Sequence, residues 1–283
     1  MKNKTIAITG ASGFLGQRLI LRLLKLKPKE IRCMAHSEKR MVEAQKKFPR
    51  CKWYIGDIVN YEQCELFIRG ADIVFHLGAL KHIPIAEENP HHAIMTNING
   101  TINVAVASHK NEVEKVIGIS TDKACNPLNV YGMTKYLMEQ LWWEYNRKGK
   151  TKFLACRYGN VAASSGSVFE IWDKLGREGK NLQITVPEMT RYYFKVDDAV
   201  DTIFKTIKKG YEDKVYIPKM KAMRMGDVAD VFAEHYGVKK ELSGNRGGEK
   251  IHEELGDGIT SDEAPRFSKR QIKKFIKDIG LLK

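Results

Sequence analysis

The sequence lacks the features that mark membrane-spanning, disulfide-bonded and metal-binding proteins. No run of about 18 apolar residues occurs in the 283-residue chain, so no transmembrane helix is expected. The five cysteines form no CxxC pair, and the eight histidines form no HExxH motif or Cys/His cluster. We therefore expect no metal site and no disulfide framework.

The chain also shows no sign of export. Its first residues, MKNKTIAITG, lead directly into a strand-like pattern instead of a signal peptide. Five unpaired thiols are typical of a reducing compartment. These features predict a cytoplasmic protein that does not bind a membrane.

The charge is unbalanced, with 48 Lys and Arg against 34 Asp and Glu, a net charge of +14. Residues 1–50 hold most of this surplus, whereas residues 51–200 are neutral. A surplus of this kind suits nucleic acids, anionic surfaces or acidic small molecules. Because no basic stripe interleaved with aromatics and no nucleic-acid-reading motif is present, acidic small molecules are favoured and nucleic acid is not expected as a partner.

Short β-branched runs alternate with helical periodicity over the first 160 residues. Strands are predicted at Thr5–Thr9, Ile31–Ala35, Trp53–Ile55, Ile73–Leu77, Val116–Ser120 and Phe153–Arg157. Helices are predicted at Phe14–Leu26, Lys39–Lys47, Tyr61–Ile68, His91–His109 and Val130–Arg147. Asn89 and Pro90 suit the N-cap and first position of the fourth helix. The alternation predicts an α/β fold with a doubly wound parallel sheet.

The pattern loosens after Arg157. Short strands are predicted at Gln183–Val186 and Tyr192–Lys195, and helices at Val196–Lys209, Met225–Tyr236 and Ser268–Ile279. We predict a nucleotide-binding domain over residues 1–160, which also receives parts of 190–215. Residues 161–283 are predicted to form a smaller, substrate-binding cap.

A glycine-rich loop links the first strand to the first helix. Glycines allow the sharp turn and close approach that a pyrophosphate needs, and the helix N-terminus offers free N–H groups. Between a first strand and first helix, this spacing predicts a Rossmann-like dinucleotide site. The residues of the loop expected to hold the cofactor are Gly10, Ser12, Gly13, Phe14, Leu15 and Gly16.

The end of the second strand bears on the choice between NAD and NADP. No Asp ends this strand, and the groups that follow are His36, Ser37, Glu38, Lys39 and Arg40. Basic groups here accept a 2′-phosphate, so NADP is favoured over NAD, although Glu38 complicates the prediction. Alternatively, Lys39 and Arg40 are only a solvated helix start.

Two further groups are candidates. Asp57, followed by Ile58 after the third strand, either accepts the adenine amino group or caps the next helix.

Tyr131 and Lys135 lie one helical turn apart on one face, so a lysine ammonium can lower the phenol pKa from its usual value of about 10. Together with Thr121 at a strand end, they form a candidate acid–base site.

These motifs resemble those of the extended short-chain dehydrogenase/reductase superfamily. More narrowly, the chain resembles inverting UDP-N-acetylglucosamine 4,6-dehydratases of polysaccharide biosynthesis. The segments that carry this resemblance are Leu77–Pro84, Glu87–Pro90, Thr96–Thr101, Ser120–Ala124, Asn126-Pro127, Arg157–Val161, Pro187–Arg191 and Gly247–Glu253. The segment Ala162–Gly166 matches the family only loosely.

The resemblance implies a set of catalytic roles. Tyr131, with Lys135 beside it and Thr121 on the same oxygen, would take the proton of the sugar C4 hydroxyl during oxidation at C4. Lys123 would then remove the C5 proton, and Asp122 would protonate the leaving C6 hydroxyl. Retaining dehydratases carry an acidic residue at the position of Lys123, so the Asp122-Lys123 pair favours inversion at C5. An ordinary salt bridge or a solvated loop lysine is the alternative.

The resemblance implies further contacts. Leu77, Gly78, Ala79, Lys81 and Asn97 are expected near the cofactor, Asn97 as an asparagine that holds a helix break or a water. Lys81, His82, Asn160, Arg191, Arg246 and Glu249 are expected near the substrate, the two arginines as a diphosphate clamp. A surface lysine, a plain polar helix face and surface ion pairs are the respective alternatives for Lys81, Asn97 and the two arginines.

The predicted function is a UDP-sugar 4,6-dehydratase that forms a dimer or higher homo-oligomer. A 4-epimerase, a retaining 4,6-dehydratase or a 5,6-dehydratase would use the same scaffold. A non-catalytic Rossmann-fold binding or regulatory protein is the alternative from a different class.

Overall fold

The computed structural model describes residues 1–283 except 165, 211–213, 245–247, 257 and 283. The chain forms two compact units. Unit 1 comprises Met1–Arg157 and Ala199–Ile217, and unit 2 comprises Tyr158–Asp198 and Pro218–Lys283. The chain therefore leaves unit 1 after the sixth strand and returns to it within a helix.

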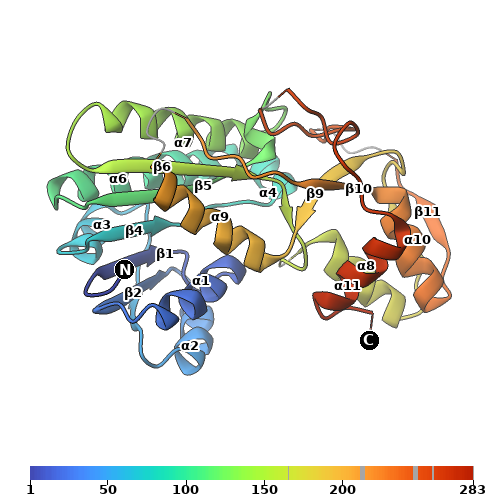
Figure 1. Ribbon diagram of the computed structural model, residues 1–283, viewed down its shortest axis with the longest axis horizontal. Helices are drawn as coiled ribbons and strands as arrows, with labels where there is room; N and C mark the ends of the chain where they lie inside the picture. Colours follow the sequence, from blue (N-terminus) through green and yellow to red (C-terminus); the bar gives the residue numbers. More distant parts are fainter. Residues whose placement is uncertain (165, 211–213, 245–247, 257, 283) are drawn as a thin grey trace. The chain divides into compact units, whose positions relative to one another are not determined.

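Unit 1 is built on a six-stranded sheet in the order β3-β2-β1-β4-β5-β6 (Figure 1). Its strands are β1 (Thr5–Thr9), β2 (Glu30–Ala35), β3 (Lys52–Ile55), β4 (Ile73–His76), β5 (Lys115–Thr121) and β6 (Lys152–Tyr158). The neighbouring pairs from β3 to β5 are parallel. The order reverses between β1 and β4, and ligands of such sheets bind at that point. The predicted parallel sheet is confirmed.

Helices cover both faces of this sheet. They are α1 (Phe14–Lys25), α2 (Glu38–Lys47), α3 (Tyr61–Ile68), α4 (Ile83–Glu88), α5 (Pro90–Ile94), α6 (Gly100–Lys110), α7 (Val130–Asn146) and α9 (Val196–Lys209). The helices α3, α6 and α7 share one core with the sheet, which includes Ala7, Val74, Val116 and Trp142. The predicted doubly wound α/β architecture is confirmed (Figure 1).

The predicted helix His91–His109 is not one regular helix. A π-helical turn, Met95–Asn99, lies between α5 and α6. Asn89 holds the N-cap position of α5 as predicted, but its side chain makes no cap bond there. Its amide donates instead to the Ile85 carbonyl oxygen at 3.0 Å, at the end of α4. Pro90 does hold the first position of α5.

Unit 2 contains short strands and three helices in its described part. A three-stranded sheet joins β10 (Lys221–Arg224), β9 (Thr190–Phe194) and β7 (Asn160–Val161), and β11 (Lys240–Leu242) pairs with β8 (Leu182–Ile184). The helices α8 (Val168–Arg177), α10 (Met225–Tyr236) and α11 (Lys269–Asp278) enclose an apolar core that includes Phe169, Trp172 and Phe232. Neither α8 nor the strands β7, β10 and β11 were predicted.

Candidate active site

The backbones of the glycine loop and of the segment after β4 touch where the strand order reverses. Gly10 has φ +67°, a conformation that favours glycine, and a Cβ there would lie 2.8 Å from the Gly78 nitrogen. Gly78 N also donates to the Thr9 hydroxyl at 3.2 Å. The two loops that carry Gly10 and Gly78 are therefore fixed against each other without any side chain between them.

The start of α1 leaves room for an anion. Gly13 is the N-cap and has no side chain to satisfy the first N–H groups of the helix. A Cβ at Gly16 would lie 2.5 Å from the Ala11 carbonyl oxygen, so the helix packs tightly on the loop. The Ser12 carbonyl oxygen accepts a bond from the Gln17 amide, while Phe14 and Leu15 form the first turn. Helix N-termini of this kind bind phosphate through their unpaired N–H groups.

A pocket of about 250 Å³ lies at the ends of β2 and β3, lined by His36, Ile55, Gly56, Asp57 and Gln63. The Asp57 carboxylate accepts from Val59 N at 3.0 Å, whereas Asn60 caps α3 by accepting from Gln63 N. The alternative in which Asp57 caps the helix is therefore wrong.

The remaining predicted groups of this region differ in exposure. Lys39 and Arg40 are exposed on the first turn of α2, and the Ser37 hydroxyl caps that helix by accepting from Arg40 N at 3.5 Å. Ile58 is buried, and a Cβ at Gly100 would lie 2.8 Å from its Cδ1 atom. Ile58 thus packs beneath Gly78 and against α6, within the core.

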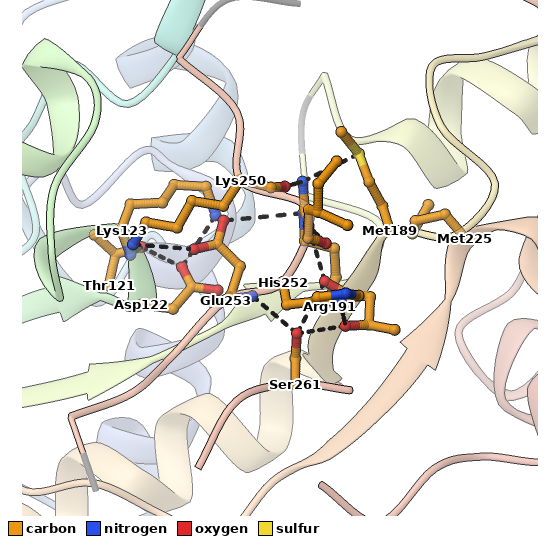
Figure 2. A network of polar contacts seen from close by, with 12 residues as sticks. Thr121, Asp122, Lys123, Met189, Arg191, Met225, Lys250, His252, Glu253 and Ser261 are labelled. Atoms are coloured by element: carbon orange, nitrogen blue, oxygen red, sulfur yellow. Dashed lines mark hydrogen bonds and ion pairs between the residues drawn. The ribbon is translucent and has the colours of Figure 1, made fainter. Parts of the chain in front are cut away.

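The end of β5 carries a compact polar cluster (Figure 2). Asp122 is fully buried, and its Oδ1 atom accepts from the Thr121 hydroxyl at 2.8 Å and from Lys123 Nζ at 3.0 Å. Its Oδ2 atom is buried without a hydrogen-bond partner. A buried carboxylate oxygen in this state is costly and suits a group that must bind or donate a proton.

Tyr131, in the first turn of α7, faces this cluster. Burial raises the pKa of its phenol, as does the negative charge of Asp122, while the positive charge of Lys123 and a hydrogen bond with Thr121 oppose that rise. The charge of Lys123 therefore acts on the phenol, an effect that the spacing of Tyr131 and Lys135 on α7 did not predict. Lys135 is buried instead one turn further on, with its Nζ 3.1 Å from Met138 Sδ, and burial lowers its pKa to about 8.

Asn97 lies in the π-helical turn and joins three elements. Its Oδ1 accepts from Leu80 N at 2.8 Å, and its Nδ2 donates to the Leu80 carbonyl oxygen and the Thr134 hydroxyl, both at 2.9 Å. Asn97 is buried, so it is not a plain polar position on a helix face. It fixes the segment Leu77–Leu80 to α7 between Tyr131 and Lys135.

Lys81 and His82 are exposed at the end of that segment. His82 is the N-cap residue of α4, and partial burial together with the charges of Lys81 and Arg40 lowers the pKa of its imidazole. Both side chains therefore lie in a positively charged region of unit 1.

Within unit 2, the predicted substrate residues are only partly assembled. Asn160 lies in β7 in register with Tyr193, and Glu249 is half-buried; Arg246 lies outside the described residues. Arg191 is buried, and its guanidinium donates to the carbonyl oxygens of Thr190, Ile251 and Lys250 and to Met189 Sδ (Figure 2). In this arrangement Arg191 holds the backbone of 250–251, and its donors do not point to a free diphosphate site.

Sequence reasoning missed a second buried cluster in unit 1. It consists of Ser120, Glu139 and Arg157, and Glu139 lies one turn after Lys135 on α7. The sequence held a signal for it, since three ionisable residues at positions 131, 135 and 139 share one helix face.

Comparison with known proteins gives the family. A model of the polysaccharide biosynthesis protein family matches residues 6–274. The chain belongs to this family. The membership also confirms the predicted extended short-chain dehydrogenase/reductase superfamily.

Two relatives of the family carry different activity names. The chain is 38% identical over 268 residues to the UDP-N-acetylglucosamine 4,6-dehydratase (inverting) of Campylobacter jejuni, covering 92% of this chain and 79% of the relative. It is also 38% identical over 264 residues to the UDP-glucose 4-epimerase of Rickettsia akari, covering 89% and 77%. The family is thus one of nucleotide-sugar dehydratases and epimerases.

Solved structures share the whole fold. Pen from Bacillus thuringiensis is 28% identical with a TM-score of 0.95, covering 98% of each chain. UDP-glucuronic acid 4-epimerase from Bacillus cereus, solved with UDP-glucuronic acid and NAD, is 20% identical with a TM-score of 0.81, covering 97% of this chain and 99% of that one. Among the described residues, no helix has the length and apolar character needed to cross a membrane.

Proposed function

We propose that the chain is an NADP-dependent UDP-N-acetylglucosamine 4,6-dehydratase that inverts C5. The observation that carries this proposal is the buried Asp122 carboxylate, bonded to Lys123 through one oxygen and unpartnered at the other. A 4-epimerase needs a base for the C4 hydroxyl, whereas a dehydratase also needs a base for C5 and an acid for C6. Asp122 and Lys123 are the side chains that supply this second pair.

The residues of unit 1 fit a dinucleotide. The pyrophosphate would lie at the start of α1, where only glycine fits between Gly10 and Gly78. The adenine would enter the pocket lined by His36 and Asp57, with Lys39 and Arg40 near the 2′-phosphate. A nicotinamide cofactor held by these residues would supply hydride transfer away from C4 and back to C6.

In the first step, Tyr131 takes the proton of the C4 hydroxyl. Burial and the negative charge of Asp122 raise the pKa of its phenol, and the Lys123 charge and the Thr121 hydrogen bond oppose this rise and favour the phenolate. Thr121 donates its one hydroxyl proton to Asp122 in this structure, and it would donate to the C4 oxygen by turning away from Asp122. The Lys123 ammonium therefore assists oxidation before Lys123 serves as a base.

In the second step, the Asp122-Lys123 pair acts as base and acid together. A proton passes from the Lys123 ammonium to the Asp122 carboxylate across 3.0 Å, which leaves a neutral amine and a carboxylic acid. The amine then removes the C5 proton, and the acid protonates the departing C6 hydroxyl. Both groups return to their charged forms, so elimination needs no proton from solvent. When hydride returns to C6, C5 takes a proton on the opposite face of the ring, which inverts C5, and the proton that Tyr131 gained from the C4 hydroxyl balances this uptake.

A 4-epimerase is the second candidate function. It would use Tyr131, Thr121 and Lys135 in the same way and leave C5 and C6 untouched. The relative named UDP-glucose 4-epimerase, at 38% identity, favours this candidate. A retaining 4,6-dehydratase or a 5,6-dehydratase would also lose water and would differ in the product at C5.

The product formed from UDP-N-acetylglucosamine tests the proposal. We expect loss of one water by mass spectrometry and an inverted C5 by NMR, without an external reductant, because the cofactor is regenerated in each turnover. An unchanged mass with altered C4 would favour the epimerase. No turnover of any UDP- or dTDP-sugar would contradict both.

Two substitutions at one position separate the roles of Lys123. Lys123→Arg keeps the positive charge beside Tyr131 but cannot act as a base, since guanidinium stays protonated. We expect it to retain C4 oxidation, seen as reduced nicotinamide, and to lose C5 exchange in D2O by at least a hundredfold. Lys123→Ala should impair both steps and still bind the cofactor. Normal dehydration by either variant would refute the base assignment.

We also propose a homo-oligomer and a cytoplasmic location. The exposed apolar side chains Met133, Tyr136 and Leu137 share one face of α7, which supports association of this helix with a second copy. Light scattering of the purified chain measures the oligomeric state directly.

A further inference from the structure

A buried charge cluster in unit 1 links β5, α7 and β6, and the proposed reaction does not use it. Glu139 is fully buried, and its carboxylate accepts from Arg157 Nε at 3.0 Å and from Arg157 Nη2 at 2.5 Å. The Ser120 hydroxyl donates a short hydrogen bond to the same carboxylate. Arg157 and Ser120 are themselves buried.

The cluster joins the elements that carry the proposed catalytic residues. Ser120 directly precedes Thr121 on β5, and Glu139 lies one turn after Lys135 on α7. A buried ion pair contributes little net stability compared with apolar side chains of similar size. Stability alone therefore gives a weak reason for a carboxylate at this position.

The charges around Lys135 come from several elements. Glu139 on α7 raises the pKa of its ammonium, against the burial that lowers this pKa to about 8. Cys156 on β6 holds its proton, because burial raises the pKa of its thiol to about 12. His76 on β4 is neutral, because burial lowers its pKa to about 3. Glu139 is thus hydrogen-bonded to one buried cation, Arg157, and acts on the charge of a second, Lys135.

We propose that Glu139 is a positioning residue of the reaction. Its carboxylate is the counter-charge that keeps Lys135 protonated, and its bond to Ser120 fixes the end of β5 against α7. This inference rests on the proposed function. Within it, we assign a charged Lys135 to support Tyr131, one turn before it on α7, in addition to the charge of Lys123 that acts on the phenol. Without Glu139, two buried cations remain, and Lys135 loses its proton at a lower pH.

The pH profile of kcat/KM tests this role. In Glu139→Gln, we expect the alkaline limit of activity to move at least one pH unit lower than in the wild-type enzyme, with KM changed less than threefold. Arg157→Met removes the competing cation and should move the same limit upward. Glu139→Asp keeps the charge and should restore most of the wild-type profile. A uniform loss of activity with unchanged limits would overturn the inference.

A measurement without activity separates this inference from the proposed function. Lysine in the unfolded chain has a pKa near 10.4, so the free energy of unfolding rises with pH wherever folded Lys135 has lost its proton first. That rise should begin near pH 8 in the wild type and at lower pH in Glu139→Gln. Adding Lys135→Met to both proteins should abolish the difference between them.

The outcomes are distinct. A wild-type chain that turns over no nucleotide sugar counts against the proposed function, and the unfolding comparison still decides on Glu139. Identical pH dependence of unfolding in wild type and Glu139→Gln refutes the charge coupling. If Glu139→Gln does not fold, the upward shift expected for Arg157→Met decides instead, and no shift refutes the inference.

Discussion

At the scale of single residues, burial sets the protonation of the side chains around β4 and α7. His76 is 1% exposed, with Nδ1 3.0 Å from the Thr9 hydroxyl and Nε2 3.3 Å from the Thr101 hydroxyl. Thr101 in turn donates to the Asn97 carbonyl oxygen at 2.7 Å. A neutral histidine thus connects the strand before the glycine loop to the helix behind the site.

The first prediction concerns this histidine. The pKa of His76 is about 3 in the folded chain and about 6.5 unfolded, so below pH 6.5 the unfolded chain binds one more proton. The free energy of unfolding should therefore reach its full value above pH 6.5 and be lower by about 2 kcal/mol at pH 5. In His76→Gln, the free energy of unfolding measured with denaturant should change less steeply with pH over this range. The exposed His235→Gln variant should keep the wild-type slope; a wild-type slope in His76→Gln would contradict the prediction.

A second residue-scale prediction concerns cofactor choice. Arg40 is exposed near the pocket at the ends of β2 and β3, where a guanidinium suits a 2′-phosphate. Arg40→Ala should weaken NADP binding about tenfold, or about 1.4 kcal/mol, and leave NAD binding within twofold. Fluorescence titration with both nucleotides measures this. Lys46→Ala, at the far end of α2, is the matched control, and equal losses for NAD and NADP would refute the role.

At the scale of elements, the π-helical turn positions the candidate site. It bends the backbone after α5 so that Asn97 points at Leu80 and Thr134. The Asn97 side-chain amide thereby forms hydrogen bonds with both the backbone N–H and the carbonyl oxygen of Leu80. The turn sets the distance between the loop after β4 and the helix that carries Tyr131.

Replacing this amide tests the element. Asn97→Ala leaves the backbone N–H and carbonyl of Leu80 without their partner, which should cost about 2 to 4 kcal/mol in unfolding free energy. Cofactor affinity should fall as well, because the loop holding Gly78 loses its anchor. Asn99→Ala in the same turn is the control, since Asn99 bonds only weakly to Met95 Sδ. Equal effects of the two variants would contradict this account.

Helices whose periodicity and end signals are strong in the sequence were predicted correctly. The starts and ends of α3, α9 and α10 coincide with their predicted bounds, and α3 has an asparagine cap. The helix α8 was missed because its N-cap Ser167 stands in a Gly/Ser-rich stretch that reads as loop. The π-helical turn was missed because it keeps helical periodicity and depends on the tertiary bonds of Asn97.

In the candidate site too, local motifs predict which residues lie close in the chain but not which tertiary contacts they make. The glycine loop, Asp122, Lys123 and Tyr131 are adjacent in motifs, so the sequence predicts their proximity. Which lysine acts on the phenol depends on side-chain directions and burial, which spacing on a helix does not determine. Long-range partners such as Glu139 and Arg157 carry no local signal for their pairing.

At the scale of the whole molecule, the net charge of +14 determines how strongly the chain attracts anions. Screening limits the reach of each charge to about 10 Å at 0.1 M salt. Most basic side chains of residues 1–50, such as Lys25 and Lys29, lie outside the pocket lined by His36 and Asp57 and are exposed or half-buried. They raise the local concentration of anions without contacting a bound one.

This charge distribution predicts a weak salt dependence. If NADP meets only a few basic groups, its affinity should fall less than tenfold between 50 and 500 mM KCl in fluorescence titrations. A dedicated nucleic-acid binder neutralises many phosphates, and its affinity falls by orders of magnitude over a similar range. We therefore expect binding of a short DNA duplex to vanish at physiological salt. Submicromolar duplex binding that persists there, with no turnover of nucleotide sugars, would favour the non-catalytic alternative over the enzyme.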